Sequence, residues 1–94
     1  METQVRDTPG TLLQAQDGVR SELRRLAGVQ PLDRAALGRL REVVHGLADQ
    51  ADRLILTLVG QGAPDLLVTA VEEVFDAFRD AEGQIEAVIK RGRR

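Results

Sequence analysis

Glu42 and His45 are the two residues whose types and spacing come closest to a reactive site. A carboxylate and an imidazole three positions apart lie on neighbouring turns of one helix face, and both groups bind divalent transition metals. Other reactive side chains are scarce, because the chain has no cysteine, one histidine and a single serine, Ser21. Neither a disulfide nor a thiolate metal site can form, and no Ser-His-Asp order is present. We therefore expect no enzyme activity.

The sequence Glu42-Val43-Val44-His45 resembles the Glu-x-x-His motif of small ferritin-like proteins that assemble from helical hairpins. That resemblance implies an iron site with Glu42 and His45 as ligands and matched carboxylates from another helix or another copy. Ligands of that kind project into a bundle, whereas both residues fall on the outer face of the helix predicted below. We therefore expect an exposed histidine beside a surface glutamate, with no metal and no cofactor, and we keep the iron site as an alternative.

Two segments carry apolar residues at alternating steps of three and four, which is the spacing of heptad a and d positions. The second series mirrors the first about residues 60–64, so that the numbers of facing residues always sum to 125. This pattern predicts an antiparallel coiled-coil hairpin with helices at about 31–59 and 64–90. The residues are Leu37, Leu40, Val44, Leu47, Ala51, Leu54 and Leu58, and then Leu67, Val71, Val74, Phe78, Ala81, Ile85 and Val88.

A shorter helix is expected at about 11–27, capped by Thr11 and followed by a glycine. Residues 1–10 are polar and read as a disordered leader, residues 11–91 as a single helical domain, and residues 92–94 as a frayed basic tail. The fold class is therefore all-α. The arrangement is either a three-helix bundle or a dimeric helical bundle.

Proline, glycine and aspartate mark the ends of the two longer helices. Pro31 suits the first position of the second helix, with Asp33 in its first turn, where the helix dipole favours an anion. Gly60 is the expected left-handed cap of that helix, and Pro64 opens the next one.

Apolar residues also occupy the positions beside the heptad core, at e on one side of the hairpin and at g on the other. We expect the helix at 11–27 to pack into the e-side groove, and at least one flank to contact another chain. The expected interface residues are Ala48, Ile55, Val68 and Phe75 at e positions, and Val43, Ala70 and Ala77 at g positions.

Charge is balanced overall but unevenly spread. The net charge is −2, yet residues 65–86 contain seven carboxylates and one arginine. This acidic strip is either a solvated face or a surface that steers a basic partner. Arg41 and Glu82 are expected to pair across the hairpin. The four basic residues near the C-terminus lack interleaved aromatics, so nucleic acid is not an expected partner.

No apolar stretch approaches the length of a membrane span, and the N-terminus lacks the apolar core of a signal peptide, so we expect no membrane contact and a soluble cytoplasmic protein. Twelve arginines against one lysine fit a bacterium with a GC-rich genome. The predicted function is that of a non-enzymatic helical module for protein–protein interaction, a scaffold, adaptor or regulator. Its partner is another protein or a second copy, and a homodimer is the expected form.

A second alternative rests on length and topology. Two helices joined by a tight turn in about a hundred residues resemble the small helical-hairpin proteins of bacterial type VII secretion. That resemblance implies export. Those proteins usually carry Trp-x-Gly at the turn, where this chain reads Leu58-Val59-Gly60-Gln61-Gly62, and the chain has neither tryptophan nor tyrosine.

Overall fold

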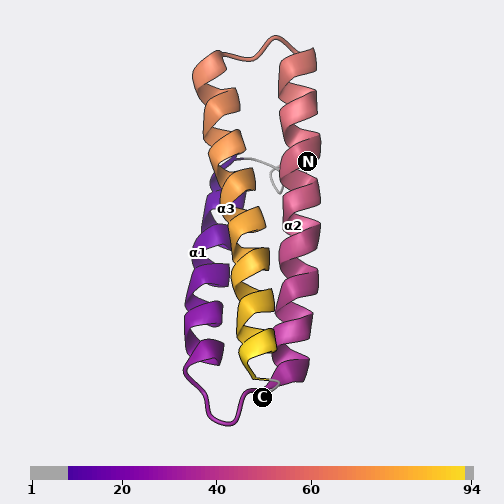
Figure 1. Ribbon diagram of the computed structural model, residues 1–94. Coiled ribbons are helices and arrows are strands. Elements are labelled where there is room, and N and C mark those ends of the chain that lie inside the picture. Colours follow the sequence, from indigo (N-terminus) through magenta and orange to yellow (C-terminus); the bar gives the residue numbers. More distant parts are fainter. Residues whose placement is uncertain (1–8, 93–94) are drawn as a thin grey trace, which may run out of the picture.

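The computed structural model describes residues 9–92 of the chain, with side chains from Gly10 onward. The described part contains three α-helices, α1 (Pro9–Ala27), α2 (Arg34–Gly60) and α3 (Asp65–Arg91), and no strand. α2 and α3 form an antiparallel hairpin, and α1 lies along one side of it (Figure 1). The protein is therefore an all-α three-helix bundle, 49 Å long, in which α2 and α3 pack most closely.

The predicted heptad residues form the core of the hairpin. All fourteen are buried or partly buried, and Phe78, Leu37 and Val44 are fully buried. The five that keep some exposure are Leu47, Leu54, Leu58, Leu67 and Ala81. The period of the apolar residues therefore predicted which faces of the two helices meet.

α1 packs on the g side of the hairpin, so the prediction that it fills the e-side groove is wrong. Val19 and Leu23 of α1 line a groove together with Ala77 and Ala81 of α3. The small side chains on this flank let the backbone of α1 approach closely, whereas the e flank carries the large ring of Phe75. α1 adds four buried side chains to the core: Leu12, Val19, Leu23 and Leu26.

The start of α1 also differs from the prediction. The helix begins at Pro9, so Thr11 lies inside it rather than at its N-cap, and Pro9 and Gly10 are helical. The rest of the predicted leader, residues 1–8, and residues 93–94 of the predicted tail lie outside the described residues.

α2 begins three residues later than the proline pattern suggested. Asp33 is the N-cap, and its Oδ1 accepts a hydrogen bond from the backbone N–H of Ala36 at 3.0 Å. Pro31 therefore precedes the helix, because the carboxylate cap satisfies an N–H donor of the first turn and thereby sets the start. At the same end of the bundle, the guanidinium of Arg34 donates to the backbone carbonyl of Gly92, which ties α2 to the end of α3.

The turn between α2 and α3 is closed by a Schellman motif. Gly62 has a φ of 72°, and its N–H donates to the carbonyl of Val59 at 3.1 Å. The N–H of Ala63 donates to the carbonyl of Leu58 at 2.9 Å, which completes the motif. The left-handed residue is thus Gly62 and not Gly60, which is the last residue of the helix.

Candidate interaction surface

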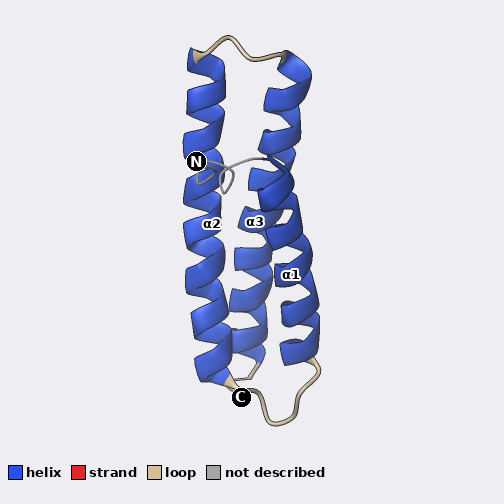
Figure 2. Ribbon diagram, turned by 180° about the vertical axis from the view of Figure 1, so that it is seen from behind, coloured by secondary structure: helices blue, strands red, loops and turns tan. Residues whose placement is uncertain are grey.

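The hairpin is longer than the helix that covers it. α3 has 27 residues and α1 has 19, and Ala27 and Val88 line one groove at the shared lower end of the bundle. At about 1.5 Å per residue, the difference leaves roughly 12 Å of hairpin, or two helical turns, beyond the start of α1. The view from behind shows the same relationship, with α1 ending well below the turn (Figure 2). We call this uncovered part the turn end.

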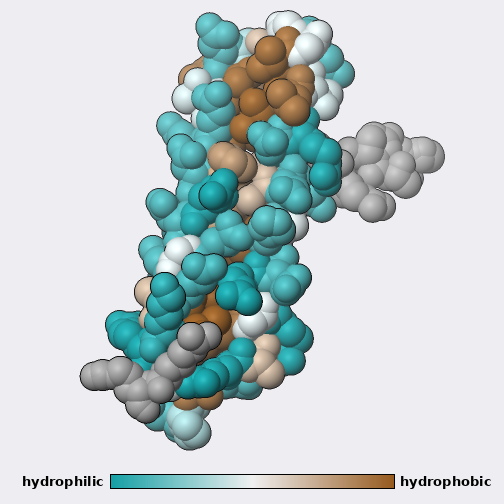
Figure 3. Space-filling model, turned by 45° about the vertical axis from the view of Figure 1, so that its right-hand side comes forward, coloured by the Kyte–Doolittle hydropathy of each residue, from teal (hydrophilic) through white to brown (hydrophobic). Residues whose placement is uncertain are grey.

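The turn end is apolar on several sides. Residues 54–71 contain a single charged residue, Asp65. Three large apolar side chains are mostly exposed there, namely Leu56 (66%), Val59 (60%) and Leu66 (83%). The core leucines of this part, Leu54, Leu58 and Leu67, are only partly buried because no third helix covers them. Figure 3 shows the result as a hydrophobic patch at the turn end of the bundle.

The predicted interface residues fall into two groups. Three of them, Ile55, Val68 and Phe75, are partly buried on the e side, away from α1. Ala48, also on the e side, is a core residue at 3% exposure and lines a groove between α2 and α3. On the g side, Val43 and Ala70 are exposed, and Ala77 is partly buried beside α1. The structure therefore brings Ala48, Ile55, Val68 and Phe75 to one face and separates the other three from it.

Carboxylates flank this e-side face. Asp49 and Asp52 of α2 line the groove beside Phe75, as does Arg79 of α3. Glu72 lies one heptad before Arg79, on the same face of α3. We define the acidic groove by its floor of Ala48, Ile55, Val68 and Phe75 and its rim of Asp49, Asp52 and Glu72.

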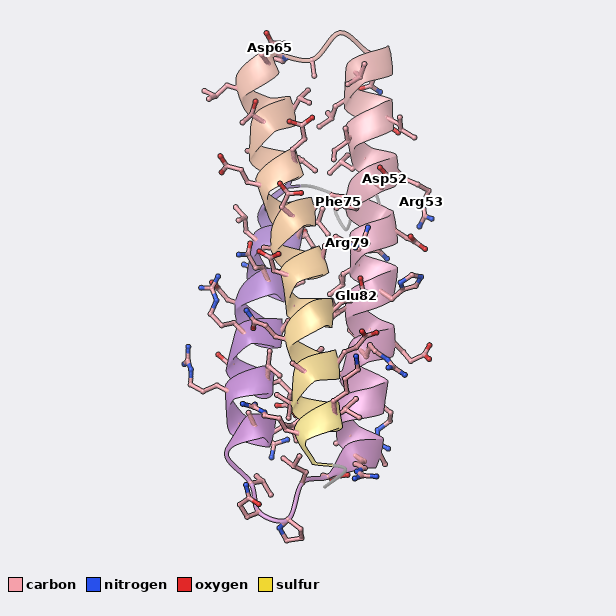
Figure 4. The ribbon with its side chains drawn as sticks, in the orientation of Figure 1. Asp52, Arg53, Asp65, Phe75, Arg79 and Glu82 are labelled. Atoms are coloured by element: carbon pink, nitrogen blue, oxygen red, sulfur yellow. The ribbon has the colours of Figure 1, made fainter. Side chains whose placement is uncertain are left out.

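The surroundings of the groove are also acidic. Residues 46–76 contain six carboxylates and one cation, Arg53. Arg53 extends outward from α2, whereas Phe75 and Arg79 lie on the side of α3 that faces α2 (Figure 4). Carboxylates therefore outnumber cations along this part of the two helices.

A polar cluster lines the lower part of the groove, below Ala48 and Phe75. Nδ1 of His45 lies 2.9 Å from Oε2 of Glu82, and Nε of Arg79 lies 3.3 Å from Oε1 of the same carboxylate. The Arg79 guanidinium also lies over the ring of Phe75, 5.9 Å from its centroid, in a cation–π arrangement. The hydrogen bond with Glu82 raises the pKa of His45, and the charges of Asp49, Glu82 and Glu42 raise it further.

The residues of the possible iron site do not form a ligand cluster in the described part of the chain. His45 and Glu42 are both exposed, and His45 pairs with Glu82 of the neighbouring helix. No group of three or more histidine or carboxylate side chains within residues 9–92 is placed to hold a metal ion. What the arrangement provides is an ion pair that joins two helices.

The expected pair between Arg41 and Glu82 does not form. Arg41 instead lies 3.8 Å from Glu86, one helical turn further along α3, and Glu82 pairs with His45 and Arg79. Side chains of a helix lean toward its N-terminus, so the side chains of antiparallel helices lean in opposite directions. This tilt moves the contact of Arg41 along α3 from Glu82 to Glu86.

Comparison with family models, curated proteins and solved structures found no match. Among the described residues, no helix has the length and apolar character needed to cross a membrane. The class of the protein is thus defined by its fold alone, as a three-helix bundle whose hairpin extends beyond its third helix. Function is inferred from the surface that this extension leaves open.

Proposed function

We propose that the chain is a non-enzymatic helical module for protein–protein interaction that docks another chain at its turn end. The observation that carries the proposal is the exposure of Leu56, Val59 and Leu66 on a two-turn extension with one charged residue. Water contact with apolar surface costs about 25 cal/mol per Å², so a partner that covers these side chains gains free energy. Contiguous patches of this kind mark interaction sites more often than isolated exposed leucines do.

The geometry of the bundle supports a helical partner. Over the lower part of the hairpin, α1 supplies the third helix, and the core leucines and valines there are buried, with the exception of Leu47. At the turn end the same heptad pattern continues, but Leu54, Leu58 and Leu67 remain partly exposed. A helix from another chain that packs on this part of the hairpin would supply the third helix that α1 supplies below.

Photocrosslinking in the native host tests the proposal. A photoreactive side chain at position 66 lies on the turn end, and one at position 21 lies on the exposed face of α1, which serves as the control. We expect a discrete crosslinked product from position 66 and none from position 21. Equal products from the two positions, or none from position 66, would contradict a docking role for the turn end.

Two kinds of partner fit this function, a second copy of the chain and a different protein. Sedimentation of the purified protein over a wide concentration range separates them, because the homodimer predicted from the sequence requires a mass that doubles with concentration. A mass that stays monomeric assigns the turn end to a different protein.

A further inference from the structure

We propose that the acidic groove binds a cationic amphipathic helix from a partner protein. This inference rests on the proposed function and names the chemistry of the partner on the e-side face, which starts at the turn end and continues below it to Ala48 and Phe75. The partner helix would place apolar side chains on the floor of the groove and lysine or arginine on both of its flanks.

The floor of the groove suits one helix of limited length. Ile55 and Val68 occupy e positions near the turn, and Ala48 and Phe75 occupy the next pair of e positions below them. The polar cluster of His45 and Glu82 ends the apolar floor at its lower side. From Val68 to Phe75 the floor spans eight residues of α3, or roughly 12 Å at about 1.5 Å per residue, which accommodates about two turns of a partner helix.

The charges on the rim of the groove favour binding of a partner helix that carries cations. Asp49 and Asp52 stand on one side of the floor and Glu72 on the other, and all three are exposed. Arg79, which lines the groove, is within 3.3 Å of Glu82. A helix with cations on both flanks therefore meets exposed carboxylates on both sides, while the methylene stems of those cations cover more of the apolar floor.

The same rim disfavours two other occupants. A second copy that used its own acidic groove would bring one carboxylate rim against another, and like charges placed together across an interface cost several kcal/mol. An anionic membrane surface would be repelled by the rim in the same manner.

Binding of designed peptides tests the inference. The probe is a helical peptide of about 14 residues with leucine at a and d positions and lysine on both flanks. One control peptide keeps the leucines and replaces every lysine with glutamate, and another scrambles the lysine peptide so that its apolar stripe is lost. We expect the lysine peptide to bind at least about tenfold more tightly than either control, and its affinity to fall as salt rises.

A matched pair of variants locates the binding site. Asp52→Asn with Glu72→Gln neutralises two carboxylates of the rim, and Glu73→Gln with Asp80→Asn neutralises two carboxylates on the other side of α3. We expect the first pair to weaken binding of the lysine peptide at least about fivefold and the second pair to change it less than about twofold. Circular dichroism of both variants confirms that the fold is retained.

Four results would overturn the inference. The first two are equal binding of the lysine and glutamate peptides, and an equal loss of affinity in the two variant pairs. The third is binding of the protein to anionic vesicles that Asp52→Asn with Glu72→Gln abolishes. The fourth is a homodimer that the lysine peptide dissociates. If any of them occurs while position 66 still crosslinks to a protein, the proposed function stands and only the cationic partner is wrong. If position 66 also fails to crosslink, both proposals are wrong.

Discussion

His45 and Glu82 join α2 to α3 through a contact of 2.9 Å between Nδ1 and Oε2. The imidazole is mostly exposed, at 68%, whereas the carboxylate is 20% exposed and also receives Arg79. His45 is the only histidine of the chain, so it is the one side chain whose ordinary pKa lies near neutrality.

Stability should therefore fall as the pH rises through the pKa of His45. The contact with Glu82 raises that pKa in the folded protein, so the folded state binds the proton more tightly than the unfolded state does. The stabilisation is fully present below about pH 6.5, the ordinary pKa of histidine, and is lost as the pH passes the raised value. NMR titration of the single imidazole gives the pKa, and urea unfolding on both sides of neutrality gives the stability.

Glu82→Gln is the control for this prediction. It removes the negative charge and should return the pKa of His45 toward its ordinary value, although Asp49 and Glu42 still raise it. It should also weaken the fall of stability above neutrality. A pKa at or below about 6.5 in the wild type would contradict the prediction.

Sequence alone predicted the core of the hairpin, because burial of Phe78 or Val44 depends mainly on the apolar period of its own helix. The side chosen by α1 was not predictable in the same way. It depends on the relative bulk of two flanks, and Ala77 on one flank allows a closer approach than Phe75 on the other. That comparison requires a three-dimensional arrangement of three helices.

The candidate site was predicted in part. The four e-side residues and the acidic character of α3 follow from the heptad positions and the composition. The open turn end does not, because it results from the difference in length between α1 and the hairpin. The heptad positions did not predict the pairing of Arg41 with Glu86. They place the helix backbones opposite each other but do not include the tilt of side chains toward the N-terminus of each helix.

The two glycines near the turn should respond in opposite directions to alanine. Gly62→Ala forces a side chain into the left-handed region at φ 72° and should cost about 1–2 kcal/mol. Gly60 ends α2 with open space around its Cβ position, so Gly60→Ala should stabilise by about 0.4–1 kcal/mol. Thermal unfolding of the two variants measures both effects. Equal losses in the two variants would place the left-handed residue elsewhere.

Two exposed glycines inside helices are sites for stabilisation. A Cβ built at Gly18 of α1 or at Gly46 of α2 meets no atom within 4 Å. Alanine restores helix propensity without a clash, so each substitution should add up to about 1 kcal/mol, and the two should add nearly independently. In a domain of this size that corresponds to roughly 4–8 °C in the melting temperature for each kcal/mol. A loss of stability in either variant would contradict the open packing at that site.

Phe78 and Phe75 are three residues apart on α3 but should have different energetic roles. Phe78 is fully buried, so Phe78→Ala leaves a cavity and should cost about 3–5 kcal/mol. Phe75 is partly buried on the floor of the acidic groove, so Phe75→Ala should cost about 1–2 kcal/mol and leave the three helices intact. Urea unfolding followed by circular dichroism compares the two variants under the same conditions.

Phe75→Glu tests whether the side chain of Phe75 belongs to the docking surface or to the core. A carboxylate on the groove floor should keep the helical content but abolish docking of an apolar helix face, because a charge would be buried beside Asp49 and Asp52. Helicity is followed by circular dichroism and docking by binding of the lysine peptide. If Phe75→Glu unfolds the chain as fully as Phe78→Ala does, Phe75 belongs to the intramolecular core, and the groove floor is not available to a partner.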